Sequence, residues 1–87
     1  MRIYKIVYTL DLYVDNDLCD TPEDHKTVAA ETMNEALSKM ETHVSKENHG
    51  FKPYKESDVI DGEKTEFTYQ YKDYQVKSAE LLMESDI

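Results

Sequence analysis

Six carboxylates stand close together near the start of the chain, with no Lys or Arg among them. Residues 6 to 25 therefore carry six of the negative charges in a chain whose net charge is −9. Carboxylates at this density can bind a cation, act in acid–base chemistry or face a basic partner. The six residues are Asp11, Asp15, Asp17, Asp20, Glu23 and Asp24.

A metal site is not predicted from these residues. Asp15-Asn16-Asp17 resembles the start of an EF-hand loop, but Cys19 stands at the third ligand position. Asp20 replaces the required turn glycine and Lys26 replaces the bidentate Glu, so an EF-hand is excluded. The soft ligands do not form a CxxC or HxxxH pair, so zinc is not expected either. They are Cys19, His25, His43 and His49.

The sequence contains no motif for nucleophilic catalysis or for phosphate binding. Cys19 belongs to no recognisable nucleophile motif. The two glycines, Gly50 and Gly62, are both assigned to turns, which leaves no glycine-rich loop for a phosphate or a dinucleotide. We therefore predict no catalytic residue, no metal and no cofactor, and a protein that is not an enzyme.

Seven tyrosines could contribute to binding. Aromatic side chains on a sheet can stack nucleic acid bases, but the accompanying basic groove is missing, so direct nucleic acid binding is not expected. Tyr4 and Tyr8 are assigned to the core. Cross-strand pairs or a protein interface are the expected roles of Tyr13, Tyr69, Tyr71 and Tyr74.

The opening segment, residues 4–14, predicts the strand that positions the acidic run. Its even positions are all apolar and its odd positions are mixed, which is the alternation of a strand with one buried face. We expect it to be the central strand of a small sheet. The even residues are Tyr4, Ile6, Tyr8, Leu10, Leu12 and Val14.

Two interpretations of residues 21–31 are open. Thr21-Pro22 fits a helix start, which would give one helix from Pro22 to about Asn48. Such a helix would be unusually long, and Thr27-Val28 favours a strand. We prefer a loop over residues 15–24 and a short strand over residues 25–31.

The main helix is predicted over residues 33–48. Thr32 and Glu35 form a capping box, and Gly50 can close the helix in the left-handed conformation. One apolar stripe recurs at helical spacing and is expected to pack on the even face of the opening strand. It consists of Met33, Ala36, Leu37, Met40 and Val44.

The last third of the chain is predicted to be β-structure. Asp61-Gly62 indicates a type I′ turn between a strand over residues 54–60 and one that begins at Glu63. The alternation breaks at Lys72-Asp73, which indicates a second hairpin or a bulge. Residues 79–83 are either the end of that strand or a short helix. The fold class is therefore α+β: a small antiparallel sheet of about four to five strands with one main helix on one face.

The composition places all of this in one domain, residues 1–87. The single Cys19 cannot form an internal disulfide, which suits a reducing compartment. Arg2 and Lys5 precede only a short apolar stretch that Asp11 interrupts, so neither an export signal nor a membrane span is predicted. The expected location is the cytoplasm.

The acidic run leads to the main functional hypothesis. If it lies at the same end of the sheet as Glu80, Glu84 and Asp86, the two segments form one acidic patch. Such a patch can imitate a row of phosphates and occupy a basic groove. The alternative is a solvated acidic surface that keeps the protein soluble.

A short, acidic, tyrosine-rich chain without a catalytic motif resembles the small proteins that phages and mobile elements use against host machinery, among them anti-CRISPR proteins and DNA mimics. The resemblance lies in size, charge and lack of motifs. It implies a non-enzymatic inhibitor in the host cytoplasm that binds a basic protein partner, not a membrane. The alternative function is an interaction or assembly module that acts through a homodimer or through docking at a strand edge.

Overall fold

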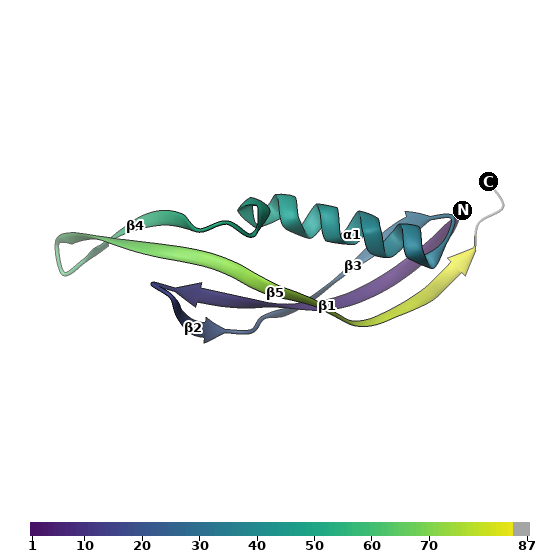
Figure 1. The fold of residues 1–87 in the computed structure, drawn as a ribbon, viewed down its shortest axis with the longest axis horizontal. Helices are drawn as coiled ribbons and strands as arrows, with labels where there is room; N and C mark the ends of the chain where they lie inside the picture. The colour runs from purple at the N-terminus through teal and green to yellow at the C-terminus, as the bar shows by residue number, and fades with distance from the viewer. Residues whose placement is uncertain (85–87) are drawn as a thin grey trace.

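The computed structural model describes residues 1–84, which form one helix packed on a five-stranded antiparallel sheet (Figure 1). The predicted α+β class with one main helix is confirmed. In chain order the elements are β1 (Arg2–Val14), β2 (Asp17–Asp20), β3 (Glu23–Ala30), α1 (Met33–Glu47), the 3-10 turn η1 (His49–Phe51), β4 (Tyr54–Ile60) and β5 (Glu63–Glu84).

β1 is the central strand, as predicted. On one side it pairs with β3 over Arg2–Thr9 and with β2 over Leu12–Val14. On the other side it pairs with β5 over nearly its whole length, from Arg2 opposite Glu84 to Val14 opposite Tyr69. β4 extends the sheet beyond β5, where it pairs with Glu63–Tyr69. The first and last strands of the described chain therefore form the longest ladder of the sheet.

The core lies between β1 and α1. The even-numbered residues Tyr4, Ile6, Tyr8 and Leu10 are buried, which confirms the alternation seen in the sequence. α1 contributes the other half of this layer, and Ala30 of β3 completes it. Leu12 and Val14 are only partly buried, since β1 runs past the end of the helix. The buried helix residues are Ala36, Met40 and Val44.

The helix ends are closed by local hydrogen bonds. The backbone N–H of Glu35 donates to Thr32 Oγ1 over 3.1 Å, which confirms the N-cap. Asn48 closes the other end, where its Nδ2 donates to the carbonyl of Val44 over 2.7 Å. Gly50 has a φ of 65°, the left-handed conformation expected after the helix. Residues 23–30 form β3, so the single long helix from Pro22 is ruled out.

Two tight turns shape the hairpins. Asp61 and Gly62 have φ values of 52° and 81°, which confirms the predicted type I′ turn between β4 and β5. Asp15 and Asn16 also have positive φ values, 49° and 68°, and join β1 to β2. The prediction of a loop throughout residues 15–24 is therefore wrong for Asp17–Asp20, which form β2, and for Glu23 and Asp24, which begin β3. All four β2 residues are exposed, so no apolar alternation marked this strand.

β5 continues as one strand through the break in its pattern. Asp73 has a φ of 56°, and the register with β1 shifts between Thr9 and Asp11. The break is therefore a bulge, and a second hairpin is ruled out. Residues 78–84 are strand, which decides against the short helix. The remaining residues of the predicted tail, 85–87, lie outside the described part.

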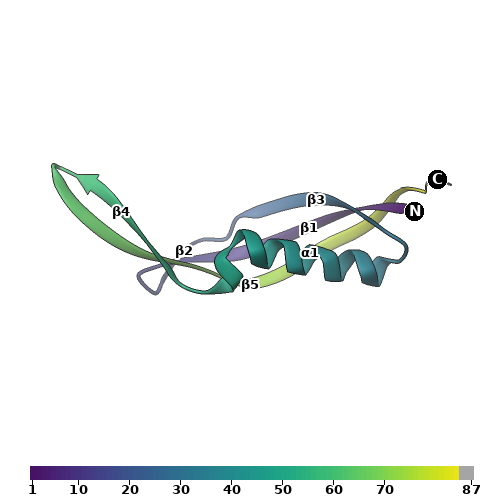
Figure 2. The same cartoon turned by 90° about the horizontal axis from the view of Figure 1, so that it is seen from above.

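The molecule is long and divides into two parts. Its extents are 57 × 21 × 19 Å and its radius of gyration is 16.6 Å, against about 12 Å for a compact chain of this length. α1 covers one end of the sheet only, while the β4–β5 hairpin projects past it at the other end (Figures 1 and 2). We call residues 11–24 and 54–73 the arm, and residues 1–10, 25–53 and 74–84 the body.

Candidate protein-binding interface

The six predicted acidic residues all lie in the arm, and four of them bond to groups close by. Asp11 Oδ1 accepts from the Thr21 hydroxyl at 2.8 Å, and Asp15 Oδ1 accepts from the backbone N–H of Thr68 at 3.0 Å. The Asp20 and Asp24 carboxylates each accept from the backbone N–H of the next residue. These four side chains therefore also shape the chain that carries them.

Asp17 and Glu23 differ from the other four. Within residues 1–84, neither side chain has a hydrogen bond or an ion pair. Both residues are exposed. They are therefore the two members of the predicted set whose charge is directed entirely to solvent or to a partner.

The structure adds a second acidic segment that the sequence analysis missed. The Asp15 backbone N–H donates to the Thr68 carbonyl over 2.8 Å, which ties the end of β1 to the first third of β5. This contact joins the acidic run to the β4–β5 hairpin, residues 54–73. The acidic residues of that segment are Glu56, Asp58, Asp61, Glu63, Glu66 and Asp73.

The net charge is confined to the arm. The arm holds twelve acidic residues and three basic ones, Lys55, Lys64 and Lys72, so its charge is −9. The rest of the chain holds seven of each and is neutral. The composition of a single segment could not reveal this separation of charge. Residues 54–73 contain both acidic and basic side chains, and only the sheet places them beside residues 11–24.

The expectation that residues 80–86 join the acidic run in one patch is wrong for Glu80 and Glu84. Antiparallel pairing places Glu80 opposite Lys5 and Glu84 opposite Arg2, at the end of β1 farthest from the acidic run. Arg2 Nε donates to Glu84 Oε1 over 2.6 Å, so this charge is also neutralised locally. Asp86, the third predicted member, lies outside the described residues.

The four tyrosines proposed for an interface are placed in two different settings. Tyr13 lies below the ammonium group of Lys72, 4.8 Å from the ring centre, and Tyr69 stacks on Tyr54 with ring centres 5.8 Å apart. Both belong to the arm. They support cross-strand contacts there, and their role in an interface stays a prediction.

Tyr71, where the arm meets the body, and Tyr74, in the body, pack against the core instead. The Tyr74 ring centre is 5.6 Å from that of Tyr8, because the bulge at Asp73 turns its side chain to the helix-covered face. The Tyr74 hydroxyl is buried without a hydrogen-bond partner among residues 1–84, and burial raises its pKa. All four tyrosines are partly buried, and Tyr71 and Tyr74 are the two whose side chains contribute to the core.

The arm also exposes large apolar side chains. Val59 and Ile60, next to the β4–β5 turn, are 67% and 47% exposed, and Leu18 on β2 is 57% exposed. Apolar side chains among acidic ones are typical of contact surfaces and are not needed for solubility. The sequence contained these residues, but their exposure depends on the missing helix cover over the arm.

A hollow lies in the body, between β3 and α1. It has a volume of about 350 Å³ and is lined on the polar side by Lys26, Lys39 and His43. The two lysine charges are not available to an anion, because Lys26 Nζ contacts Glu47 Oε1 at 2.9 Å and Lys39 Nζ contacts Glu35 Oε1 at 3.0 Å. This hollow is therefore a seam between the strand and the helix, and we assign it no ligand.

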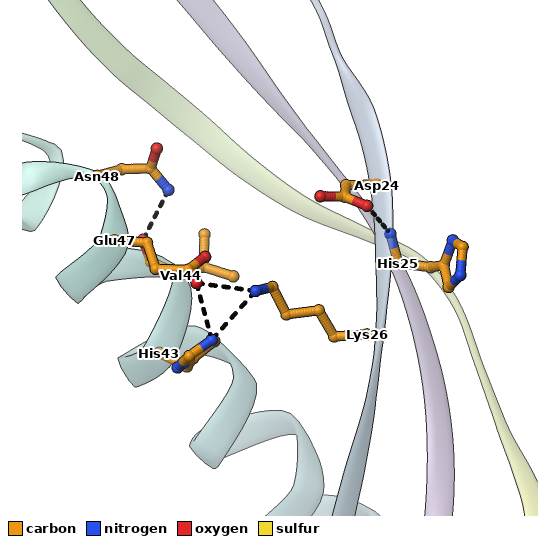
Figure 3. Close-up of polar contacts among 7 residues, drawn as sticks. All are labelled: Asp24, His25, Lys26, His43, Val44, Glu47 and Asn48. Atoms are coloured by element: carbon orange, nitrogen blue, oxygen red, sulfur yellow. Dashed lines mark hydrogen bonds and ion pairs between the residues drawn. The ribbon is translucent and has the colours of Figure 1, made fainter.

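Three side chains hold this seam together (Figure 3). His43 Nε2 lies 3.1 Å from both Lys26 Nζ and Glu47 Oε1, so the three groups form a triangle between β3 and the end of α1. The hydrogen bond from Lys26 lowers the pKa of Glu47, and the same bond raises the pKa of Lys26. The triangle links the strand to the helix electrostatically.

We expect this link to make the free energy of unfolding depend on pH in the acidic range. Since the pKa of Glu47 in the folded protein lies below its ordinary value of 4.5, its contribution is present above that pH and is lost as the pH falls further. The free energy of unfolding, measured with urea between about pH 3 and 7, should fall less on acidification in Glu47→Gln than in the wild type. Identical pH profiles for the two proteins would contradict this assignment.

Comparisons with known proteins leave the fold and this surface as the only basis for assigning a function. No family model, no curated protein and no solved structure matches the chain. Among residues 1–84, no cluster of His, Cys, Asp and Glu could hold a metal ion. The one helix of this part of the chain is neither long nor apolar enough to span a membrane.

Proposed function

We propose that this protein is a non-enzymatic binding protein whose acidic arm occupies the basic groove of a nucleic-acid-binding protein. The observation that carries the proposal is the confinement of the whole net charge of −9 to the arm. A solvated acidic surface would need no such separation. The body has a net charge of only +1 against −9 for the arm. This separation directs the protein's field to one end, which favours encounter with a basic partner through that end.

The arm carries fewer negative charges per unit length than the DNA that it would imitate. Glu63–Asp73 of β5 extends about 35 Å at a strand rise of about 3.3 Å per residue. Double-stranded DNA carries about 20 phosphates over that length. The twelve acidic residues of the arm reach about half of this density. The arm can therefore replace part of the electrostatic contribution of DNA, and the rest of the affinity must come from other contacts.

The exposed apolar residues of the arm supply those contacts. The arm exposes the apolar side chains of Leu18, Val59 and Ile60, and a bound nucleic acid would not offer this hydrophobic area to the partner. Such residues favour a protein partner and give specificity beyond charge. On this proposal the protein acts as an inhibitor of the anti-CRISPR or DNA-mimic type in the cytoplasm, where it competes with nucleic acid for its partner.

The test is capture from a lysate with the immobilised protein, followed by elution with a short DNA duplex. The partner should be retained at about 50 mM salt, be lost by about 500 mM salt, and be released by DNA at low salt. Mass spectrometry identifies what the DNA releases. A partner that stays bound in excess duplex, or that binds equally well at high salt, would exclude competition for a basic groove.

A further inference from the structure

The second half of β5 has an outer edge without a partner. β4 pairs with β5 only over Glu63–Tyr69, and β1 lies on the opposite side. Beyond Tyr69, the outer edge of β5 is therefore unpaired up to Glu84, within the part of the chain that the structure describes (Figure 1). An open edge of this length is a template for pairing with another strand.

The register identifies the backbone groups that face outward. The Ala29 carbonyl accepts from Lys39 Nζ at 3.1 Å, so it points away from β1. Ile3, opposite Ala29, therefore directs its backbone groups to β5, and even-numbered residues of β1 direct theirs to β3. The β5 residues opposite Tyr8, Ile6 and Tyr4 must then direct their N–H and C=O groups outward. They are Val76, Ala79 and Leu81.

Apolar side chains are concentrated on the same stretch. Leu82 and Met83 are 50% and 60% exposed, and Val76 and Leu81 are 40% and 47% exposed. Four of the eight exposed large hydrophobic residues in the described chain therefore lie within eight positions of one unpaired strand. Bulges interrupt the stretch but no proline blocks it, and its one lysine is Lys77.

We propose that this edge pairs antiparallel with the same edge of a second copy, about a two-fold axis at Ala79. The three outward-facing residues are then self-complementary: Ala79 pairs with its own copy, and Val76 pairs with Leu81 of the other chain, twice. The extra residue at Lys77, where the register with β1 shifts, is accommodated as a bulge opposite Glu80. The two sheets become one continuous sheet.

Charge complementarity supports a second copy as the occupant. Lys77 Nζ donates to Gln75 Oε1 over 3.2 Å, so its side chain lies on the face of Gln75 and Thr9. Glu80, opposite Lys5, lies on that same face, away from the helix. In the proposed register Lys77 of each chain faces Glu80 of the other, which gives two intermolecular ion pairs.

The distribution of net charge permits this contact. The edge belongs to the body, whose net charge is +1, so the two copies do not bring their acidic arms together. Antiparallel pairing directs the arms to opposite ends of the dimer. The dimer does not rest on the proposed function, because no arm residue takes part in it.

The test is the mass measured by sedimentation equilibrium between about 5 and 500 µM, a range suited to a small interface. The wild type should approach twice the chain mass of 10.2 kDa. Lys77→Glu and Glu80→Lys should each weaken association by at least about tenfold, because each places like charges opposite one another twice. The double variant Lys77→Glu/Glu80→Lys should restore association, because opposite charges then face each other again with their positions exchanged.

Each outcome decides the proposal. Restoration in the double variant is expected only if these two residues face each other. A wild type that stays monomeric over the whole range, or a double variant as weak as either single one, would overturn it. The variants should fold, because the Lys77 and Glu80 side chains are exposed and bond to no core residue. Circular dichroism checks this. The arm variant Asp17→Asn/Glu23→Gln should dimerise normally, which separates this result from any failure of the proposed function.

Discussion

Neutralising four arm carboxylates should weaken partner binding by about fivefold or more at low salt. The change is Asp17→Asn, Glu23→Gln, Glu63→Gln and Glu66→Gln in one chain. None of these side chains has a hydrogen bond or an ion pair within residues 1–84, so the variant should fold. Exposed ion pairs contribute about 0.2–1 kcal/mol each, which gives about 1–4 kcal/mol for four. Affinity for the captured partner, measured by calorimetry, tests this.

Two double variants with the same change in charge separate the arm from the body. Asp17→Asn/Glu23→Gln removes two negative charges from exposed side chains of the arm, and Glu31→Gln/Glu41→Gln removes two from exposed side chains of the body. If the arm is the contact surface, only the first pair lowers the affinity and flattens its dependence on salt concentration. Equal losses in both doubles would mean that the partner senses the net charge of the whole protein, and unchanged affinity in the quadruple variant would remove the arm from the interface.

Ile6→Ala should cost about 2–5 kcal/mol of unfolding free energy. Ile6 is fully buried in β1, within the cluster that includes Met40 and Val44 of the helix. A chain of this length has about 4–13 kcal/mol in total. Because only eight hydrophobic residues are buried in the described chain, the cavity removes a large share of the core. Urea denaturation at neutral pH measures the loss.

Val59→Ala is the comparison for this prediction. Val59 is 67% exposed near the tip of the arm, and its truncation should change the unfolding free energy by less than about 1 kcal/mol. Comparable losses in the two variants would mean that the arm is as important for stability as the helix-covered body. The body would then no longer be the part that holds the fold together.

Local patterns predicted most of the fold. The alternation in β1, the N-cap residue Thr32 and the turn at Asp61-Gly62 each depend on neighbouring residues, and all three are confirmed. The second half of the predicted capping box is not formed, because the Glu35 carboxylate accepts from the backbone N–H of Glu31 instead of that of Thr32. β2 was missed because a short strand with no buried side chain has no apolar period. Tyr74 was misplaced because the bulge at Asp73 reverses the side of the sheet that the following residues face.

The candidate site was only partly accessible from the sequence. The acidic run of residues 11–24 is visible in any window of the chain. Its extension by residues 54–73 requires the pairing of β1 with β5, which brings together segments separated by the whole helix. The same pairing moved Glu80 and Glu84 to the opposite end of the sheet. Long-range register, rather than composition, decided both results.

The pairing of β1 with β5 also has a consequence for the rate of folding. Arg2 meets Glu84 and Tyr8 meets Val76, so the longest ladder closes loops of roughly 70 to 80 residues. Contacts of such sequence separation form slowly, and proteins dominated by them fold in milliseconds to seconds. β1, β3 and α1 are neighbours in sequence and can assemble first. Until β5 arrives, one edge of the central strand stays open to other chains.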